Sequence, residues 1–512
     1  MPSGGLLDLV AHGIQDVFLI GNPQITFFKT VYKRHTNFSM ESIQIPLTGD
    51  PNFNTRYSCT IPVKGDLLSS LFLEVDLPQI IARTVDPTGG TDTNYDIGRG
   101  TISWINNIGH GLIDHIDFKI GGQIVDTNYG EWMEIWTELS QEIGRKTGLD
   151  YMLARSANPG IDGPKPVIVT GPRTLIIPLQ FWFCRNIGLA LPLIALQYHP
   201  VEMDFYFYPL SRCYTFGPNN YYYATNHVSS PPDPINDPYK LDLVKSYTNT
   251  ADATTFKARI IHGHNNETYY TIPGNNLTGN GTSVSPYIAT LTSPLATSYN
   301  NELIYISPNG TIASTVSLAG VRLYGDYIYL DTVERKEFAQ NKHRYLIEQV
   351  QYRQSETIQG NVTDQKFPIK FNLPVKELIW VLQRDDVFLT NDVFNFSNAV
   401  DPAVVRGNIL SSTYILYNGI ERFVSRNGDY FRLTVPYQRH TRVPNDFYYM
   451  YCFALKPEEH QPSGISNFSK INFVDLNISV QSGLPSIQLR VYGLSYNILR
   501  IMNGMGSVAF GN

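Results

Sequence analysis

The chain has 512 residues and a formal net charge of −6 at pH 7, and 42% of its residues are hydrophobic. Because a single hydrophobic core stops growing at about 250–300 residues, this length predicts two domains. The negative charge argues against a protein whose main partner is nucleic acid, since such proteins concentrate Lys and Arg on one face. We therefore expect no direct, specific binding of nucleic acid.

The composition favours β-structure. The chain contains 33 Tyr, 26 Phe, 39 Gly and 32 Pro, and only 16% of its residues are charged. Aromatic residues fit the half-buried surface of a pleated sheet, whereas Gly and Pro mark turns. An all-β fold is the expectation.

The N-terminal arm, residues 1–24, is predicted to contain a short amphipathic helix. Its apolar residues recur at helical spacing over residues 6–18, and Gly21-Asn22-Pro23 ends the pattern. A basic segment is missing at the start, and Asp8 and Asp16 interrupt the apolar residues. A secretory signal peptide is therefore not expected.

From residue 25 onward the hydrophobic pattern is mainly that of strands, for example over 56–61, 71–77, 113–120, 175–183 and 201–208. The most apolar region, residues 175–196, contains Arg185, Asn186 and two prolines. These residues break the run of about 20 apolar residues that a membrane helix needs. Two buried strands joined by a turn are predicted there.

Three short sequence matches recur in the same order along the chain. They pair residues 62–67 with 374–379, 120–125 with 417–422, and 321–325 with 489–493. The second pair carries Gly at a turn between apolar strands, which is typical of a β-hairpin. The repeats predict two copies of one β-domain.

This alignment divides the chain after the arm into one domain over residues 25–331, a linker helix over 332–348 and a second domain over 349–512. The copies differ in the connection that precedes their last strand. In the second copy, residues 482–486 are enough to form this connection. In the first, an interval of about 210–318 is rich in Asn, Thr, Ser, Gly and Pro. So long an irregular interval predicts a surface insertion with strands of its own.

Four Asn-x-Ser/Thr sequons fall in this insertion and are candidate glycosylation sites: Asn266, Asn276, Asn280 and Asn309. Such sequons also arise by chance in a segment so rich in Asn and Thr. They act only where a glycosylation machinery meets the chain.

The sequence offers no catalytic, cofactor or metal site. His262, His264 and Glu267 approach the cupin metal pattern, but the glutamate stands one residue too near and the group lies in the insertion. Adjacent acids at Asp385 and Asp386 would point to opposite faces of a strand. Motifs for nucleophilic or phosphate chemistry are missing. Four widely spaced cysteines suggest buried free thiols in a reducing compartment.

Three stretches carry a resemblance to a known family: residues 4–38, with Asn22-Pro23-Gln24-Ile25-Thr26-Phe27-Phe28-Lys29; residues 330–349, with Asp331-Thr332-Val333-Glu334-Arg335; and residues 451–469, with Pro457-Glu458-Glu459-His460-Gln461-Pro462-Ser463-Gly464. Together they resemble the major capsid proteins of nucleocytoplasmic large DNA viruses. The stretches span the start, middle and end of the chain, so the resemblance covers nearly all of it.

The resemblance implies two consecutive eight-stranded antiparallel jelly rolls with long surface loops and a few short helices. It also implies a non-enzymatic protein that forms homotrimers of pseudo-hexagonal outline. Such capsomers tile an icosahedral shell over an internal membrane and an enclosed DNA genome. Neighbouring capsomers, minor capsid proteins and penton proteins would be the partners, and assembly would take place in the host-cell cytoplasm.

In such a shell the N-terminal helix would face inward, toward membrane or minor capsid proteins, through Leu6, Val10, Ile14 and Phe18. Packing of this helix on the base of its own domain is the alternative. A different function, that of a carbohydrate-binding or carbohydrate-active β-sandwich, would use exposed aromatic rings. Trp132 and Trp136, beside a predicted hairpin, and Trp182, in an apolar strand, favour core positions instead.

Overall fold

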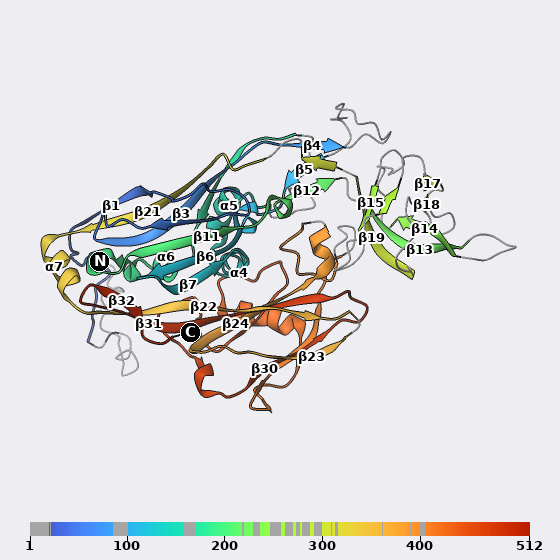
Figure 1. Ribbon diagram of the computed structural model, residues 1–512. Helices are drawn as coiled ribbons and strands as arrows, with labels where there is room; N and C mark the ends of the chain where they lie inside the picture. The colour runs from blue at the N-terminus through green and yellow to red at the C-terminus, as the bar shows by residue number, and fades with distance from the viewer. Residues whose placement is uncertain are drawn as a thin grey trace, which may run out of the picture.

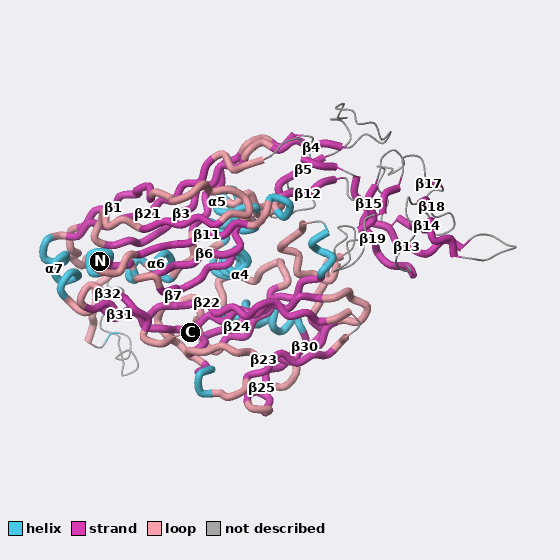
Figure 2. Tube along the Cα trace, viewed as in Figure 1, coloured by secondary structure: helices cyan, strands magenta, loops and turns pink. Residues whose placement is uncertain are grey.

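The computed structural model describes residues 20, 22–84, 101–156, 169–217, 220–228, 236–245, 258–261, 270–272, 277–278, 287–290, 300–308, 310–312, 316–360, 362–389, 391–399 and 405–511. Two β-sandwiches lie side by side, and a smaller group of strands projects from one end of the first (Figure 1). Figure 2 shows that strands dominate both sandwiches and that the helices are short.

The first sandwich has two antiparallel sheets. One has the order β1-β21-β3-β10, with β9 also paired to β3, and the other has the order β2-β11-β6-β7. Their strands are β1 (Phe38–Ile45), β2 (Arg56–Thr60), β3 (Leu67–Leu77), β6 (Ile113–Ile120), β7 (Gln123–Tyr129), β9 (Arg173–Pro178), β10 (Leu191–Pro192), β11 (Val201–Phe207) and β21 (Gly320–Leu330).

The second sandwich repeats this order. Its sheets are β22-β31-β24-β28, with β29 and β32 at the margins, and β23-β30-β25-β26, with β27 paired to β25. Their strands are β22 (His343–Ile358), β23 (Asp364–Pro368), β24 (Pro374–Arg384), β25 (Leu410–Tyr417), β26 (Ile420–Glu421), β27 (Arg426–Asn427), β28 (Tyr448–Cys452), β29 (Ser466–Asn467), β30 (Val474–Val480), β31 (Ile487–Met502) and β32 (Met505–Val508).

When the short C-terminal β32 is set aside, the first, last and third strands of each sandwich lie next to one another in one sheet, and the second, penultimate and fourth lie next to one another in the other. This is the strand order of a jelly roll, in which two sheets face each other across one core. The predicted fold class of two consecutive jelly rolls is confirmed.

The sequence repeats have structural causes. Residues 321–325 lie in β21 and residues 489–493 in β31, the strands that pair with β3 and β24 respectively. A Cβ on Gly325 would stand 2.9 Å from Leu68 Cδ1, and a Cβ on Gly493 would stand 2.7 Å from Phe371 Cδ2. Each repeated glycine therefore makes room for a large core side chain.

The second repeat forms two tight hairpins, as predicted. Ile120 pairs with Gln123 across Gly121-Gly122, and Tyr417 pairs with Ile420 across Asn418-Gly419. All four turn residues have positive φ, from 51° to 85°. Two-residue turns with positive φ at both positions match the twist of the flanking strands, which explains Gly and Asn there.

The helices are α3 (Ile108–Gly111), α4 (Gly130–Ser140), α5 (Ile143–Met152), α6 (Trp182–Arg185), α7 (Thr332–Gln340) and α8 (Val435–Arg439). Two predictions need correction. The linker helix is α7 alone, because residues 343–348 already pair with β31 as part of β22. The apolar region over 175–196 forms β9, α6, two short 3-10 turns and the two-residue β10 rather than two strands.

Strands within the interval 210–318 form a sheet of their own. Its order is β16-β15-β19-β13-β14-β18-β17, from β13 (Asn220–Val228), β14 (Asn236–Lys245), β15 (Ala258–Ile261), β16 (Tyr270–Ile272), β17 (Leu277–Thr278), β18 (Tyr287–Thr290) and β19 (Asn300–Pro308). This sheet lies beyond the end of the first sandwich (Figure 1).

Two smaller sheets connect it to the first sandwich. β12 (Tyr214–Gly217) pairs with β5 (Thr101–Trp104), and β4 (Ile80–Thr84) pairs with β20 (Gly310–Ile312) and β8 (Val169–Thr170). Among the described residues, no helix combines the length and apolar character needed to cross a membrane.

Candidate functional site

The contact between the two jelly rolls, called the seam below, is the most elaborate part of the described structure. Helix α4 lies between the rolls (Figure 1) and belongs by sequence to the first. Its apolar residues nevertheless join the hydrophobic core of the second roll: Trp132, Ile135, Trp136 and Leu139. Trp132 packs against Tyr492 of β31, with ring centroids 5.7 Å apart.

Residues of the second roll likewise join the hydrophobic core of the first. Ile347 of β22 and Leu499 and Ile501 of β31 belong to the core of the first roll. Strand β24 is consequently buried along almost its whole length, whereas β3 alternates between buried and partly exposed residues. The two hydrophobic cores therefore extend into the seam, which is not a contact between the outer surfaces of two separately folded rolls.

Charged residues at the start of α4 fix the helix to the second roll. Glu131 accepts hydrogen bonds from Arg490 Nε at 2.8 Å and from the Tyr492 hydroxyl at 2.9 Å. Arg490 Nη2 also lies 2.7 Å from the second Glu131 oxygen. Burial opposes the charge of Arg490, but Glu131 raises the pKa of the guanidinium above its ordinary value.

Glu134, one turn later on α4, is buried among cations. Its carboxylate lies 2.9 Å from His110 Nδ1 and 3.3 Å from Arg155 Nε. Burial alone would raise the pKa of Glu134, but Arg155 and His110 outweigh it and lower the pKa to about 2. Arg155 also reaches Asp446 of the second roll at 3.1 Å, so the group spans the seam.

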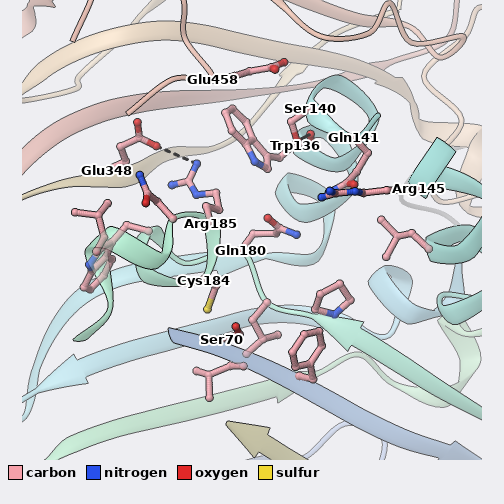
Figure 3. A pocket seen from close by; sticks show the side chains of 18 of the residues that line it. Ser70, Trp136, Ser140, Gln141, Arg145, Gln180, Cys184, Arg185, Glu348 and Glu458 are labelled. Atoms are coloured by element: carbon pink, nitrogen blue, oxygen red, sulfur yellow. Dashed lines mark hydrogen bonds and ion pairs between the residues drawn. The ribbon is translucent and has the colours of Figure 1, made fainter. Parts of the chain in front are cut away.

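A cavity of about 790 Å³ opens beside this region and is drawn in Figure 3. Arg185 of α6 and Glu348 of β22 face each other there, with Nη1 and Oε2 3.1 Å apart. The Arg185 guanidinium lies over the Trp136 ring, 4.9 Å from its centroid. Glu348 also pairs with the fully buried Lys376 of β24.

Asp126 of β7 faces β22 across the seam. Its Oδ1 accepts a hydrogen bond from the Val350 backbone N–H at 3.1 Å, and its buried Oδ2 has no hydrogen-bond partner. Burial raises the pKa of this carboxyl to about 7.

A separate polar cluster lies in the second roll. Glu377 of β24, His440 after α8 and Cys452 of β28 bring their polar atoms within 4.8 Å of one another. Glu458 contacts the other side of the His440 ring. Burial opposes protonation of His440, but Glu377, Cys452 and Glu458 raise its pKa well above the ordinary value.

Several predicted positions lie outside the described residues. They are Leu6, Val10, Ile14 and Phe18 of the arm, the sequons at Asn266, Asn276, Asn280 and Asn309, and the His262, His264 and Glu267 group. Asp385 and Asp386 are described and do not act together: Asp386 binds Arg384 Nε at 2.9 Å, and Asp385 accepts from Gln488 at 2.9 Å.

The sequence analysis missed helix α4 and placed Trp132 and Trp136 only beside a predicted hairpin. Their burial was predicted correctly, and so was that of Trp182. The spacing of Trp132, Ile135, Trp136 and Leu139 at i, i+3, i+4 and i+7 was the available signal for a helix. All four cysteines are free thiols, of which Cys59 and Cys213 are buried and Cys184 and Cys452 are partly buried.

Two jelly rolls of the same topology that share their cores through a buried helix define a double jelly-roll protein. Residues 26–331 match the family model for the N-terminus of the major capsid protein, and residues 334–507 match the model for the large eukaryotic DNA virus major capsid protein. The chain belongs to the major capsid proteins of large eukaryotic DNA viruses.

Individual relatives are similar in sequence to this chain over nearly the whole length of both proteins. The major capsid protein of Pyramimonas orientalis virus is 34% identical over 99% of this chain and 100% of its own. That of Paramecium bursaria Chlorella virus 1 is 31% identical over 100% of both chains. Among solved structures, the Faustovirus major capsid protein superposes with a TM-score of 0.66 at 14% identity, covering 96% of this chain and 94% of its own.

A quasi-atomic model of the PBCV-1 virus capsid gives a TM-score of 0.63 at 24% identity and covers 95% of this chain and 100% of its own. The matched families consist of structural capsid proteins, so the prediction of a non-enzymatic capsid component of the virion is confirmed.

Proposed function

We propose that this chain forms homotrimers of pseudo-hexagonal outline, which tile the outer icosahedral shell over an internal membrane and an enclosed DNA genome. The supporting observation is that two rolls of the same strand order lie side by side and share their cores through α4. Three such chains around a threefold axis supply six similar walls, and a closed ring of six fills a hexagonal lattice.

Large apolar side chains remain exposed on the second roll and suit contacts with further copies. Val405 is 90% exposed, Tyr437 80%, Ile420 75% and Val424 74%. Obligate interfaces bury more than about 2,000 Å² and are rich in apolar residues. A monomer that leaves such residues in water has a reason to associate.

The native mass of the purified chain tests the proposal. The expected species has three times the chain mass of 57.8 kDa and persists on dilution. A monomer at micromolar concentration would contradict it. A monomer that also binds a glycan array would instead support the carbohydrate-binding alternative, which the burial of Trp132, Trp136 and Trp182 disfavours.

The N-terminal arm is assigned to the inner face of the shell, toward membrane or minor capsid proteins, while penton proteins are further partners of the capsomer. Beside the arm, residues 22–37 contain no helix or strand and leave Phe27 91%, Phe28 98% and Tyr32 80% exposed. Deleting residues 1–24 should allow trimers but prevent shells. Loss of trimers instead would favour packing of Leu6, Val10, Ile14 and Phe18 on the chain's own roll.

The insertion sheet is assigned to the outer surface of the capsomer, because it projects from one end of the first roll (Figure 1). Modification at Asn266, Asn276, Asn280 or Asn309 would then be accessible to a host or viral glycosylation machinery. Peptide mass spectrometry of virions tests each sequon, and unmodified peptides at all four would remove this part of the proposal.

Assembly is assigned to the host-cell cytoplasm, where reducing conditions agree with four free cysteines. The formal charge of −6 supports a shell that encloses the genome without specific binding to it. Electron microscopy of infected cells tests the location, and empty shells confined to another compartment would contradict it.

A further inference from the structure

We propose that Glu377, His440 and Cys452 form a binding site for one zinc-like divalent cation inside the second jelly roll. This inference does not depend on the assembly proposed above. It concerns a cluster that the spacing of residues in the sequence did not reveal, because its members come from three separate segments.

The distances between the three ligand atoms fit one metal ion. Glu377 Oε2 lies 3.1 Å from His440 Nε2, and Cys452 Sγ lies 3.6 Å from His440 Nε2 and 3.7 Å from Glu377 Oε2. Tetrahedral zinc, with bonds of about 2.0–2.3 Å, separates its nitrogen and oxygen ligands by about 3.4 Å and sulfur from either by about 3.6 Å.

Backbone structure holds these three side chains in place. Glu377 and Cys452 are directly opposed in the β24–β28 ladder, so the ladder sets the distance between carboxylate and thiol. His440 follows α8, and its backbone N–H binds the Pro436 carbonyl at 2.8 Å. The Glu377 and His440 side chains have no exposed surface.

The far side of the imidazole has the partner that a metal-bound histidine usually has. His440 Nδ1 lies 2.9 Å from Glu458 Oε1, and the same carboxylate accepts the Thr441 backbone N–H at 2.9 Å. A carboxylate on the second ring nitrogen fixes the tautomer that leaves Nε2 free to bind metal. Glu458 is thus a positioning residue.

One atom of the cluster still lacks a partner. Glu377 Oε1 is buried without a hydrogen bond. An unsatisfied buried carboxylate oxygen costs free energy, and a second bond to the same cation would remove that cost. Thiolate, imidazole and carboxylate together are the ligand set that suits zinc rather than magnesium or calcium.

The site would be structural. It would tie α8 and the segment carrying Glu458 to β24, a strand at the seam. Because ligands converge only in the folded chain, binding stabilises the fold in the manner of other structural metal sites.

The test uses the full-length purified chain. After loading with zinc and removal of free metal, elemental analysis should give close to one zinc per chain. Replacement by cobalt should produce a thiolate-to-cobalt charge-transfer band in the near ultraviolet. Metal far below one per chain, or cobalt loading without that band, would overturn the proposal and leave a buried ion pair beside a thiol.

Three variants test the thiol ligand, a control thiol and the positioning carboxylate. Cys452→Ser should abolish the band, whereas Cys213→Ser, at a buried thiol away from the cluster, should keep it. Glu458→Gln should retain the band but weaken metal affinity by about 10–100-fold. A band that persists in Cys452→Ser would place the metal elsewhere and refute the site. If Cys452→Ser does not fold, the wild-type spectrum and the metal content still decide.

Discussion

The surroundings of two buried carboxylates at the seam shift their pKa values in opposite directions. Glu134 is surrounded by Arg155 and His110, so its pKa falls to about 2 although burial opposes its charge. Asp126 is dominated by burial, so its pKa rises to about 7, with Arg185 opposing and Glu348 adding to the rise. The first group stabilises the fold when charged, and the second costs stability when charged.

Asp126→Asn should therefore change the pH dependence of stability. In the wild type, the folded state holds a proton on Asp126 between the usual pKa of 3.8 and about 7, while the unfolded chain has lost it. The free energy of unfolding then falls as pH rises through this window, by at most about 1.4 kcal/mol per unit.

Urea unfolding at several pH values measures this slope. The Asn variant should lose less stability between pH 4 and 7 and be the more stable protein at pH 8. Asp50→Asn, at an exposed position, is the matched control and should follow the wild type. Parallel curves for Asp126→Asn and wild type would contradict the assignment.

Gly493→Ala should destabilise the second roll by about 1–3 kcal/mol, because overpacking a core forces its side chains to move. The new methyl group would stand 2.7 and 2.8 Å from two ring carbons of Phe371. The denaturation midpoint is the measurement. Gly144→Ala, in α5 with open space around it, should be neutral or slightly stabilising. An equal effect of both substitutions would argue against crowding as the cause.

At the scale of elements, the tight hairpins and repeated strands were predictable because Gly at a turn and alternating apolar residues act locally. Helix α4 was not predicted, although Trp132, Ile135, Trp136 and Leu139 have helical spacing, since two tryptophans beside a Gly turn also suit a strand. The linker helix was predicted too long because residues 343–348 carry enough apolar and charged residues for either state. The pairing with β31 determines that residues 343–348 form a strand and not a helix.

The candidate metal cluster illustrates what sequence spacing cannot show. Glu377, His440 and Cys452 are separated by 63 and 12 positions, and only the β24–β28 register brings the first and last together. The seam likewise joins residues that are far apart in the sequence, since Glu131 and Arg490 meet only after both rolls have formed.

Trp132→Ala should lower the stability of the whole chain by about 3–5 kcal/mol, the usual cost of removing a buried aromatic side chain. Trp132 is fully buried and packs against Tyr492 across the seam. Thermal unfolding with limited proteolysis measures the change, and cleavage between the rolls should accelerate. Val333→Ala, at a residue 70% exposed, should shift the stability by less than about 0.5 kcal/mol. Similar losses for both variants would mean that the seam is not critical.

At the scale of the whole molecule, the length and the repeats predicted two β-domains and an insertion, and the family resemblance implied that the domains are jelly rolls. They did not predict that the rolls share their cores, because hydrophobic pattern alone does not tell which body a buried face will meet. The strands β13 to β19 of the insertion pair only with one another among the described strands. Strands β13 to β19 therefore form a separate sheet, which β12 and β20 connect to the rest of the first domain.

Replacing residues 218–309 with a short Gly/Ser linker should leave the rolls folded. β12 and β20, which flank this segment, pair with β5 and β4 and would remain. Circular dichroism and native mass should report folded trimers with a mass reduced in proportion to the deletion. The wild-type chain, prepared in the same way, is the control. If the shortened chain aggregates while the wild type stays in solution, the sheet is needed to support the roll.

Helix α4 also sets an order of events during synthesis. Its tryptophans leave the ribosome about 360 residues before the last strand of the roll that covers them, a wait of roughly 20–70 s at ordinary elongation rates. During that interval we expect the faces of both indole rings that pack on the second roll to lack their partners. We therefore expect the first roll to be prone to aggregation, and to benefit from chaperones, until the second has been translated.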